Sequence, residues 1–387
     1  MSEGYFDLVA GRDVCGWIWD PANPQLPIMA HVFINGREVC SGLANHYRPD
    51  LQAAGIGNGE HAFYVPLPDE YLNGQEVLLE VRGIDGLPIH RTPLVTTLPN
   101  LVFQPIAPPP VPHPIPLAVC GIVRDEAPYL LEWIAWHRLI GVDHFVLFDN
   151  ESVDGTTAML KSLAKAGLVD HVVWPNIKDM PAQRAAYIAG LARLGWRCRW
   201  VAFIDADEFL NPLRGETLPQ ILADYDTAAG LVVPWRLFGS NGHVQKDDEL
   251  VINRFTRRGP AESHLNHSVK TIVQARLVAR PDIHTPKLAA GSLVDEFGEL
   301  AGTQGHPDRH AVPAAQRLVL NHYFTKSREE WYHKRLRGKA CEVVGTDGWL
   351  RPDNHFDAHD LNDIEDLGLA NRAAEVQAEI ARLRQLL

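Results

Sequence analysis

A proline-rich segment divides the chain into two parts. Residues 99–116, with the sequence PNLVFQPIAPPPVPHPIP, contain eight prolines in eighteen positions. Each proline fixes φ at about −65° and removes a backbone N–H donor, so neither an α-helix nor a regular sheet can run through the segment. Proline-rich stretches of this kind behave as semi-rigid spacers. The sequence therefore predicts a linker over residues 99–116, with a separately folded unit on each side.

The part before the linker, residues 1–98, has the pattern of an all-β domain. Short apolar runs, among them DVCGWIWD, IMAHVFI, HAFYVPLP and EVLLEVRGI, are separated by glycine, proline and asparagine. Asn35 and Gly36 form a two-residue hairpin signal between two such runs. We expect a small β-sandwich. Trp17 and Trp19 share one face of a strand, where they are part of the core, a platform that binds glycans or a docking surface.

The part after the linker alternates between strand and helix patterns over residues 117–340. The runs LAVCGIV, HFVLFDN, LVDHVVWP and WVAFIDADE are predicted strands, and the segments between them have helical patterns. Repeated βαβ units form a mainly parallel sheet with helices on both faces, so the predicted fold class is α/β. Further strands follow, among them LVINRFTRR, and residues 341–387 are predicted to form a C-terminal helical extension.

Composition and charge exclude several classes of protein. The formal net charge of −12 leaves no basic excess for binding nucleic acid over a broad surface. Five widely spaced cysteines without a CxxC pair argue against a disulfide framework and a zinc knuckle. No apolar run reaches the roughly 18 residues of a membrane-spanning helix, and the N-terminus lacks the pattern of a secretion signal. We therefore expect a cytoplasmic protein, for which peripheral contact with a membrane stays open.

Charged side chains follow three of the predicted parallel strands. They are Arg124, Asp125 and Glu126 after the first strand, Asp149 and Asp154 after the second, and Asp205, Asp207 and Glu208 after the fourth. The carboxyl ends of parallel strands meet at one edge of a sheet, where ligands bind. Carboxylate oxygens select Mg²⁺ or Mn²⁺, which proteins hold together with the phosphates of a substrate. The sequence thus predicts a charged ligand and a divalent cation at this edge, with Glu208 either supporting the site or solvated.

The spacing Asp-x-Asp is weak evidence by itself. The chain repeats it at Asp224 and Asp226, after the helical pattern LPQILA, in a position where aspartate is common in turns. We interpret this second copy as a loop. The metal prediction therefore depends on the strand that precedes Asp205 and Asp207.

Several motifs in a fixed order resemble a known family. They are GIVRDEAPYLLEWIAWHRLIGVDHFVLFDNESVDGT, WVAFIDADEFL, FGSNG, SVKTIV and LNHYFTKSREEWYHKR. Together they resemble the bacterial relatives of glycosyltransferase families 2 and 92 over roughly residues 117–340. The resemblance implies a GT-A fold, with a Rossmann-like, mainly parallel mixed sheet. It also implies metal-dependent transfer of a sugar, usually with inversion, from a nucleoside diphosphate donor, most simply a UDP-hexose.

The resemblance also implies roles for individual residues. The expected cofactor is Mn²⁺ or Mg²⁺, and the expected partners are a nucleotide-sugar donor and a carbohydrate or lipid-linked acceptor. Asp207 is the expected direct metal ligand, and Asp205 lies nearer the ribose. The late histidines His322 and His284 compete for a place at the metal. The expected donor-binding residues are Arg124, Asp125, Glu126, Asp149, Asp154, Gln183, Arg184, Asp205 and Lys326.

Inversion requires a general base, which the sequence does not single out. The candidates are Asp247, Asp248, Glu262 and His264. Trp235 and Phe238 are either core residues or stacking partners for an acceptor sugar. The cations that could neutralise the departing diphosphate are Lys326, Arg328, Lys334 and Arg335.

Two other functions compete with a glycosyltransferase. Haloacid-dehalogenase-like phosphatases also place Asp-x-Asp at a strand end, but on the first strand, whereas here it lies on the fourth and is followed by Glu208 and Phe209. A non-catalytic glycan-binding protein would make the charged strand ends vestigial. Both functions stay open at the level of the sequence.

Overall fold

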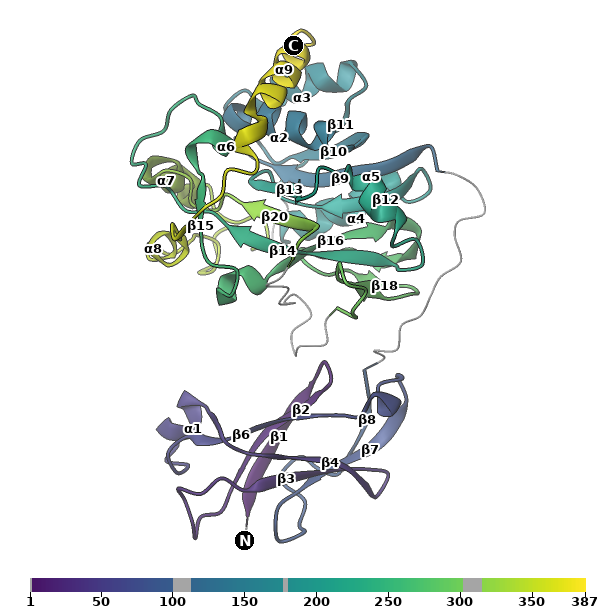
Figure 1. Ribbon diagram of the computed structural model, residues 1–387, viewed down its shortest axis with the longest axis vertical. Coiled ribbons are helices and arrows are strands. Elements are labelled where there is room, and N and C mark those ends of the chain that lie inside the picture. The colour runs from purple at the N-terminus through teal and green to yellow at the C-terminus, as the bar shows by residue number, and fades with distance from the viewer. Residues whose placement is uncertain (1, 100–112, 177–179, 302–314) are drawn as a thin grey trace. The chain divides into compact units, whose positions relative to one another are not determined.

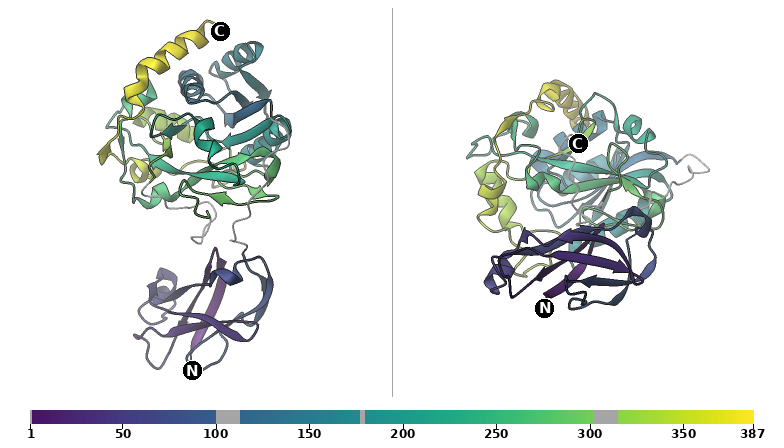
Figure 2. Two further views of the ribbon diagram at one scale, coloured as in Figure 1. Left: turned by 45° about the vertical axis from the view of Figure 1, so that its right-hand side comes forward. Right: turned by 60° about the horizontal axis from the view of Figure 1, so that its bottom comes forward.

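The computed structural model describes residues 2–99, 113–176, 180–301 and 315–387 (Figures 1 and 2). The chain forms two compact units, one with strands β1 to β8 and the other with the helices and strands from β9 onward. Most of the predicted linker lies outside the described residues. Its last two residues, Ile115 and Pro116, already belong to strand β9 (Ile115–Val123), so the second unit begins slightly earlier than we predicted.

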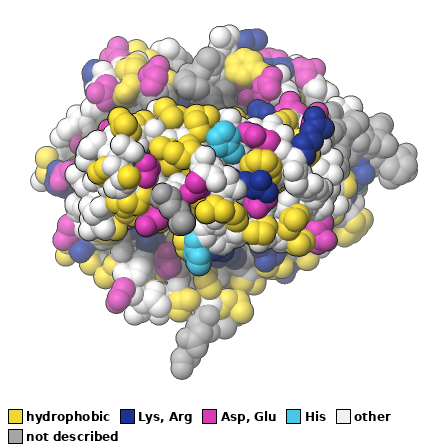
Figure 3. Space-filling model, turned by 90° about the horizontal axis from the view of Figure 1, so that it is seen from below, with side chains coloured by type: hydrophobic (Ala, Val, Ile, Leu, Met, Phe, Trp, Pro, Cys, Tyr) yellow, Lys and Arg dark blue, Asp and Glu magenta, His cyan; other side chains and the backbone are white. Residues whose placement is uncertain are grey.

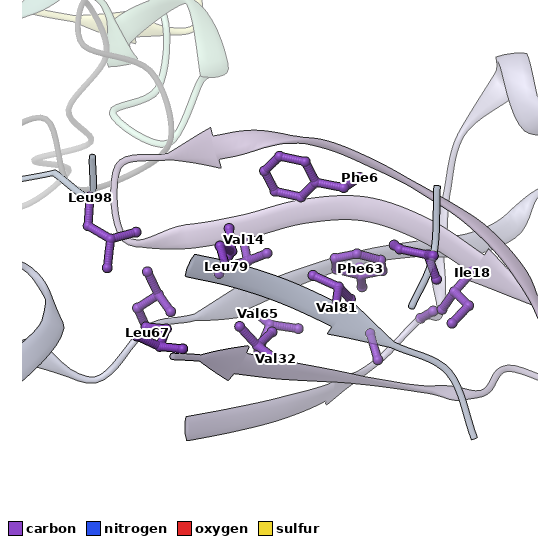
Figure 4. Close-up of a cluster of buried hydrophobic side chains, with 14 of the residues drawn as sticks. Phe6, Val14, Ile18, Val32, Phe63, Val65, Leu67, Leu79, Val81 and Leu98 are labelled. Atoms are coloured by element: carbon purple, nitrogen blue, oxygen red, sulfur yellow. The ribbon is translucent and has the colours of Figure 1, made fainter. Parts of the chain in front are cut away.

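The N-terminal unit consists of two antiparallel four-stranded sheets. One has the order β1 (Glu3–Ala10), β2 (Asp13–Trp19), β6 (Glu60–Pro66) and β5 (His46–Tyr47), and the other β4 (Arg37–Leu43), β3 (Met29–Ile34), β7 (Glu76–Arg82) and β8 (Leu94–Thr97). A short helix, α1 (Pro49–Ala53), precedes β6. Phe6, Val14, Val32, Phe63 and Leu79 belong to the core that both sheets share (Figure 4). The predicted β-sandwich is confirmed.

Two local predictions in this unit have different outcomes. Asn35 and Gly36 connect β3 to β4 with φ values of 50° and 81°, as a type I′ turn requires, so the predicted hairpin is confirmed. Trp17 and Trp19 are only half-buried, while Ile18 between them is wholly buried. The interpretation of the tryptophans as core is therefore wrong, because Ile18 fills the core and alternation along the strand turns its neighbours outward. Figure 3 shows hydrophobic side chains interspersed with charged ones on the face seen from below.

The second unit is built on a mixed sheet with the order β11, β10, β9, β12, β16, β14, β20 and β13. Strands β10 (His144–Asp149) and β12 (Cys198–Phe203) pair in parallel with β9, and β11 (Val169–Val173) pairs in parallel with β10. Strand β16 (Val269–Gln274) pairs antiparallel with β12 and with β14 (Gly230–Leu237). Strand β20 (Leu318–His322) runs parallel to β14, and β13 (Glu208–Pro212) antiparallel to β20. The order confirms the predicted α/β class, with the first strand β9 inside the sheet.

Helices cover both faces of this sheet (Figure 1). Helix α4 (Ala182–Leu194) packs on one face, where Gly190 lies so close to Cys120 that a Cβ atom would be 2.3 Å from its Sγ. Helix α2 (Ala127–Leu139) packs on the other face, and its Trp133 Nε1 donates to the carbonyl of Glu208 at 2.8 Å. Helix α3 (Thr156–Lys165) follows β10. The buried tryptophans of α2 thus fix the strand that follows the Asp-x-Asp motif.

The segment LVINRFTRR was predicted to be a strand, and this prediction is wrong for most of its length. Residues Val251–Arg254 form a helical turn, α6. The backbone N–H groups of Val251 and Ile252 donate to the buried Glu132 carboxylate at 2.8 and 3.0 Å. A buried carboxylate needs such donors, and the free N–H groups at a helix start supply them.

The C-terminal part of the chain belongs to the second unit and is not only helical. Strand β21 (Ile364–Glu365) pairs with β15 (Arg257–Arg258), and helix α9 (Ala373–Arg384) packs on α2. The other elements are α5 (Leu218–Ala223), β17 (Val278–Arg280), β18 (Lys287–Leu288), β19 (Leu293–Val294), α7 (Arg328–Leu336) and α8 (His355–His359). In the described part of the chain, no helix is long and apolar enough to cross a membrane.

Candidate active site

A cavity of about 350 Å³ lies at the carboxyl ends of β9 and β12. Further lining residues come from strands β14 and β20, from helix α4, from helices α7 and α8 and the segment between them, and from loops after β10, β11 and β17. Nine of the residues that the sequence analysis proposed for the site line it, namely Arg124, Glu126, Gln183, Asp205, Asp207, Trp235, His284, His322 and Lys334. The expected convergence of the strand ends therefore occurs for Arg124 and Glu126 after β9 and for Asp205 and Asp207 after β12.

Asp205 is held from three sides. Its Oδ1 accepts hydrogen bonds from Gln183 Nε2 at 2.7 Å and from the Tyr187 hydroxyl at 3.3 Å. Its Oδ2 accepts from Lys270 Nζ at 3.0 Å. The Asp205 side chain is nevertheless 33% exposed, so it keeps a surface toward the cavity. The lysine neutralises the carboxylate and fixes its orientation.

Glu208 is buried and supports Asp205. The sequence had left open whether Glu208 supports the site or is solvated. Its side chain is wholly buried, and its Oε2 accepts from the Asp205 backbone N–H at 2.8 Å. Lys270 Nζ lies 3.3 Å from the same oxygen. Burial raises the pKa of Glu208, with the Asp205 and Asp207 carboxylates adding to the shift and Lys270 opposing it. Glu208 and Lys270 thus anchor Asp205 from beneath.

Asp207 lies at a junction of two basic side chains. Its Oδ2 contacts Lys334 Nζ, and His322 Nε2 is 3.6 Å from the same oxygen. All three side chains are nearly buried. Burial raises the pKa of Asp207, but Lys334 and His322 outweigh it and hold that pKa well below the usual value. The Asp207 carboxylate is therefore ionised, with Lys334 as its counter-ion.

The cavity carries an excess of positive charge. Its described lining has three acids, Glu126, Asp205 and Asp207, against five lysines and arginines, which are Arg124, Lys334, Arg337, Lys339 and Arg351. This excess stands out in a chain with a net charge of −12. Low-dielectric walls strengthen such a field. The cavity is thus suited to an anion.

Other predicted donor-binding residues stabilise loops beside the cavity rather than line it. Asp149 accepts from the Ser152 N–H at 3.2 Å and from the Thr157 hydroxyl at 2.5 Å. Asp154 accepts from the N–H groups that start α2 and α3, at 3.0 and 2.9 Å. Asp125 accepts from the Val153 N–H at 2.7 Å. These aspartates hold the strand-end loops in place.

Two more predicted residues lie at the margin of the site. Arg184 Nε donates to Asp282 at 2.9 Å, and its side chain is 57% exposed. Lys326 Nζ stacks over the Tyr129 ring at 3.3 Å and lies 4.0 Å from Glu126. Lys326 lines a neighbouring cavity that shares Lys334 and Arg337 with the main one.

The four candidate bases do not line the main cavity. Asp247 lies 3.3 Å from Arg254 Nε, and together with Asp248 it borders a different pocket near the end of α9. Glu262 lies before a 3-10 turn and His264 lies at its start, and both residues are outside the lining of the main cavity. Phe238 is buried against Tyr323, whereas Trp235 and His284 do line the cavity. Arg328 and Arg335 pair with Asp357 and Asp353 at 2.9 Å, away from the site.

Sequence reasoning missed the residues that the C-terminal segment contributes. Trp349, Arg351, His355 and His359 all line the cavity, and all follow the predicted domain end at residue 340. It also missed Lys270, although a lone lysine inside the apolar run SVKTIV was a usable signal. Arg337 shows how the segment is attached, because it donates to the carbonyl of Arg124 at 2.6 Å and contacts the Glu126 carboxylate.

Comparison with known proteins gives one family and several relatives. Residues 113–334 match the model of glycosyltransferase family 92. A family 92 protein of Oryza sativa subsp. japonica is 31% identical over 262 residues, and one of Arabidopsis thaliana is 37% identical over 241 residues. The matches cover 66% and 59% of this chain but only 39% and 38% of the relatives. These relatives are plant proteins, whereas the motifs had pointed to bacterial ones.

Solved structures are more distant. The S. aureus TarS structure in complex with UDP is 15% identical, with a TM-score of 0.32, over 54% of this chain and 60% of that one. Against the two plant relatives described above, the chain spans about two fifths of their length.

Proposed function

Because the chain belongs to glycosyltransferase family 92, we propose that it transfers a sugar from a nucleoside diphosphate donor to a hydroxyl acceptor. The observation that carries this proposal is the cavity at the strand ends, where cations exceed acids beside an ionised Asp207. A diphosphate has the charge to match it. A UDP-hexose is the donor and a carbohydrate or lipid-linked hydroxyl the acceptor in this proposal.

The residues at Asp207 suit a divalent cation. In an octahedral Mg²⁺ site with bonds of about 2.1 Å, neighbouring ligand atoms lie about 3.0 Å apart. Asp207 Oδ2 and His322 Nε2 are 3.6 Å apart, so a small adjustment lets both bind one ion. Among the described residues no group of three or more His, Cys, Asp or Glu side chains could hold a metal. Two protein ligands plus diphosphate oxygens are the usual complement for Mg²⁺ or Mn²⁺.

The chain's own residues divide the work of the reaction. Asp207 and His322 would hold the ion, which supplies positive charge to the diphosphate as it leaves. Asp205, fixed by Lys270 and Gln183, faces the donor. Arg124 and Lys334 line the cavity where the leaving group carries its charge.

An inverting transfer also needs a proton acceptor on the acceptor side. The three carboxylates of the described cavity lining all contact a lysine or arginine. His359 differs, because its Nδ1 donates to the carbonyl of His355 at 2.8 Å, which leaves a lone pair on Nε2. Burial lowers the pKa of His359, so the ring is neutral at pH 7. His359 thus replaces the sequence candidates as the general base in this proposal.

Replacing His359 by alanine tests this role. We expect the rate of UDP release from the donor to fall about a hundredfold or more, with UDP affinity unchanged, because the base acts only on the acceptor. The acid limb of the rate profile, expected below pH 6.5, should also disappear. His264→Ala is the matched control, since His264 lies outside the cavity lining. An unchanged rate in His359→Ala would assign the base elsewhere.

The function itself is tested by a donor screen. Thermal unfolding is followed with UDP, GDP, dTDP and their sugars, each with MnCl₂ and with EDTA. A ligand at 100 times its Kd adds about 2.7 kcal/mol of stability, which raises the melting temperature of the second unit by several degrees. We expect UDP and one UDP-hexose to do so only with the metal. Stabilisation by no nucleotide would reject the proposal and favour a non-catalytic glycan-binding protein.

A further inference from the structure

The oxygen of Asp207 that faces His322 is also the oxygen that Lys334 contacts. A divalent cation bound between Asp207 and His322 would lie within a few ångströms of the Lys334 ammonium. Two such charges in a buried site repel strongly. Lys334 and a metal ion therefore compete for one carboxylate oxygen.

We propose that Lys334 is a built-in counter-ion that holds Asp207 in the donor-free protein and moves to the diphosphate when metal and donor bind. This inference rests on the proposed function and adds a binding order to it. The consequence is that Mn²⁺ and UDP bind cooperatively, and that each binds weakly alone.

The burial of both charges explains the cooperativity. The Lys334 and Asp207 side chains are 11% and 12% exposed, so neither charge can be left without a partner at low cost. A metal ion alone would separate Lys334 from its carboxylate, and a diphosphate alone would separate Asp207 from its ammonium. When both ligands bind, each buried charge has a new partner. Coupling of this kind is reciprocal, so each ligand strengthens the other equally.

The surroundings of Lys334 allow the movement. Its Nζ donates to the carbonyl of Phe324 at 2.7 Å and lies over the Phe324 ring at 4.3 Å. These two contacts keep the ammonium in the cavity when a metal ion binds the Asp207 carboxylate. An ammonium has three donors, so a further one can reach a phosphate oxygen.

Three other cations of the cavity are less suited to the exchange. Arg337 and Arg351 donate to backbone carbonyls of Arg124 and Gly338, at 2.6 and 2.8 Å. Lys339 pairs with Glu342 at 3.9 Å, away from Asp207.

The experiment measures Mn²⁺ binding from the electron paramagnetic resonance signal of the free ion, with and without saturating UDP. In the wild type we expect UDP to tighten Mn²⁺ binding about tenfold or more. In Lys334→Met, which keeps the length of the side chain without its charge, Mn²⁺ alone should bind about tenfold tighter than in the wild type. The effect of UDP on Mn²⁺ affinity should then nearly vanish. Lys165→Met, at the exposed end of α3 and outside the cavity lining, is the matched control and should behave as the wild type.

The possible outcomes separate this inference from the proposed function. Equal Mn²⁺ affinity in Lys334→Met and wild type overturns the exchange, as does wild-type Mn²⁺ affinity that UDP leaves unchanged. UDP binding without any Mn²⁺ binding also overturns it and makes Lys334 a permanent counter-ion. Absence of UDP binding under all conditions instead rejects the proposed function. If Lys334→Met does not fold, Lys334→Gln and the wild-type coupling give the same decision.

Discussion

Asp207→Asn is expected to abolish metal-supported UDP binding and to lower sugar transfer about a thousandfold or more. The substitution removes the charge that, with His322, would hold the divalent cation, and metal ions contribute several kcal/mol to the stabilisation of a leaving phosphate. The measurement is UDP release from the UDP-hexose found in the donor screen, together with calorimetric titration of UDP in MnCl₂. The substitution removes the charged partner of Lys334, so unfolding curves are recorded to check that the variant still folds.

The second Asp-x-Asp copy provides the matched control. Asp226 pairs with Arg199 at 2.7 Å near the surface, with its side chain 38% exposed. Asp226→Asn should therefore leave UDP binding and transfer at the wild-type level. Equal losses in the two variants would show that the effect of Asp207→Asn comes from general destabilisation. Retained transfer in Asp207→Asn would show that sugar transfer does not depend on the Asp207 carboxylate.

Glu330→Gln is expected to destabilise the second unit by about 3–5 kcal/mol at pH 7, as breaking a buried ion pair does. Glu330 accepts two hydrogen bonds from Arg254, both at 2.9 Å, and one from the Tyr129 hydroxyl at 2.7 Å. It also contacts Ser327, the N-cap of α7. The Glu330 and Arg254 side chains are 3% and 1% exposed. The substitution removes the buried counter-ion of Arg254, which leaves only the more exposed Asp247 beside the guanidinium, and it loosens the helix that carries Lys334.

The effect of Glu330→Gln should depend on pH. Burial acts to raise the pKa of Glu330, but hydrogen bonds from Arg254 and Ser327 outweigh it and lower this pKa from 4.5 to about 2. A carboxylate with a lowered pKa in the folded state contributes stability above its unfolded pKa and loses it as the pH falls. The difference between wild type and variant should thus be full above pH 4.5 and shrink toward pH 2.

Denaturant unfolding at pH 7 and pH 3 measures both effects. The control is Glu375→Gln, which breaks the surface pair between Arg372 and Glu375 and should cost less than about 1 kcal/mol. A loss in Glu330→Gln no larger than in the control, or one that does not change with pH, would contradict the role given to the buried pair.

The sequence was sufficient to predict that charged residues after two of the parallel strands meet, and the structure has a cavity there. The strand LAVCGIV delivers Arg124 and Glu126, and WVAFIDADE delivers Asp205 and Asp207, because parallel strands bring their carboxyl ends to one edge. The Asn35–Gly36 hairpin was equally predictable, since positive φ at both positions follows from local preference.

Polar residues at a strand end serve two purposes that the sequence does not distinguish. Asp149 and Asp154 follow a parallel strand as Asp205 does, yet they accept hydrogen bonds from loop and helix N–H groups. The difference depends on which donors lie nearby, and this is decided by the loop conformation. A pattern of residue types therefore predicted the right edge of the sheet but too many residues for the cavity.

The C-terminal side of the cavity could not be predicted from local patterns. Arg351 and His359 reach it because Arg337 fastens the end of α7 to the carbonyl of Arg124, more than two hundred positions earlier in the chain. Likewise, the candidate bases were chosen for their place in the sequence, whereas Asp247 is held by Arg254 beside a different pocket. Contacts of this range come from the folded structure alone.

Calorimetric titration of the wild-type protein with UDP in MnCl₂, repeated in EDTA, tests the central claim most directly. The claim is that the cavity around Asp207 holds a nucleoside diphosphate together with a divalent cation. It predicts one UDP site per chain in MnCl₂ and strongly weakened binding in EDTA. Absence of UDP binding in MnCl₂, or binding that Asp207→Asn leaves intact, would contradict it.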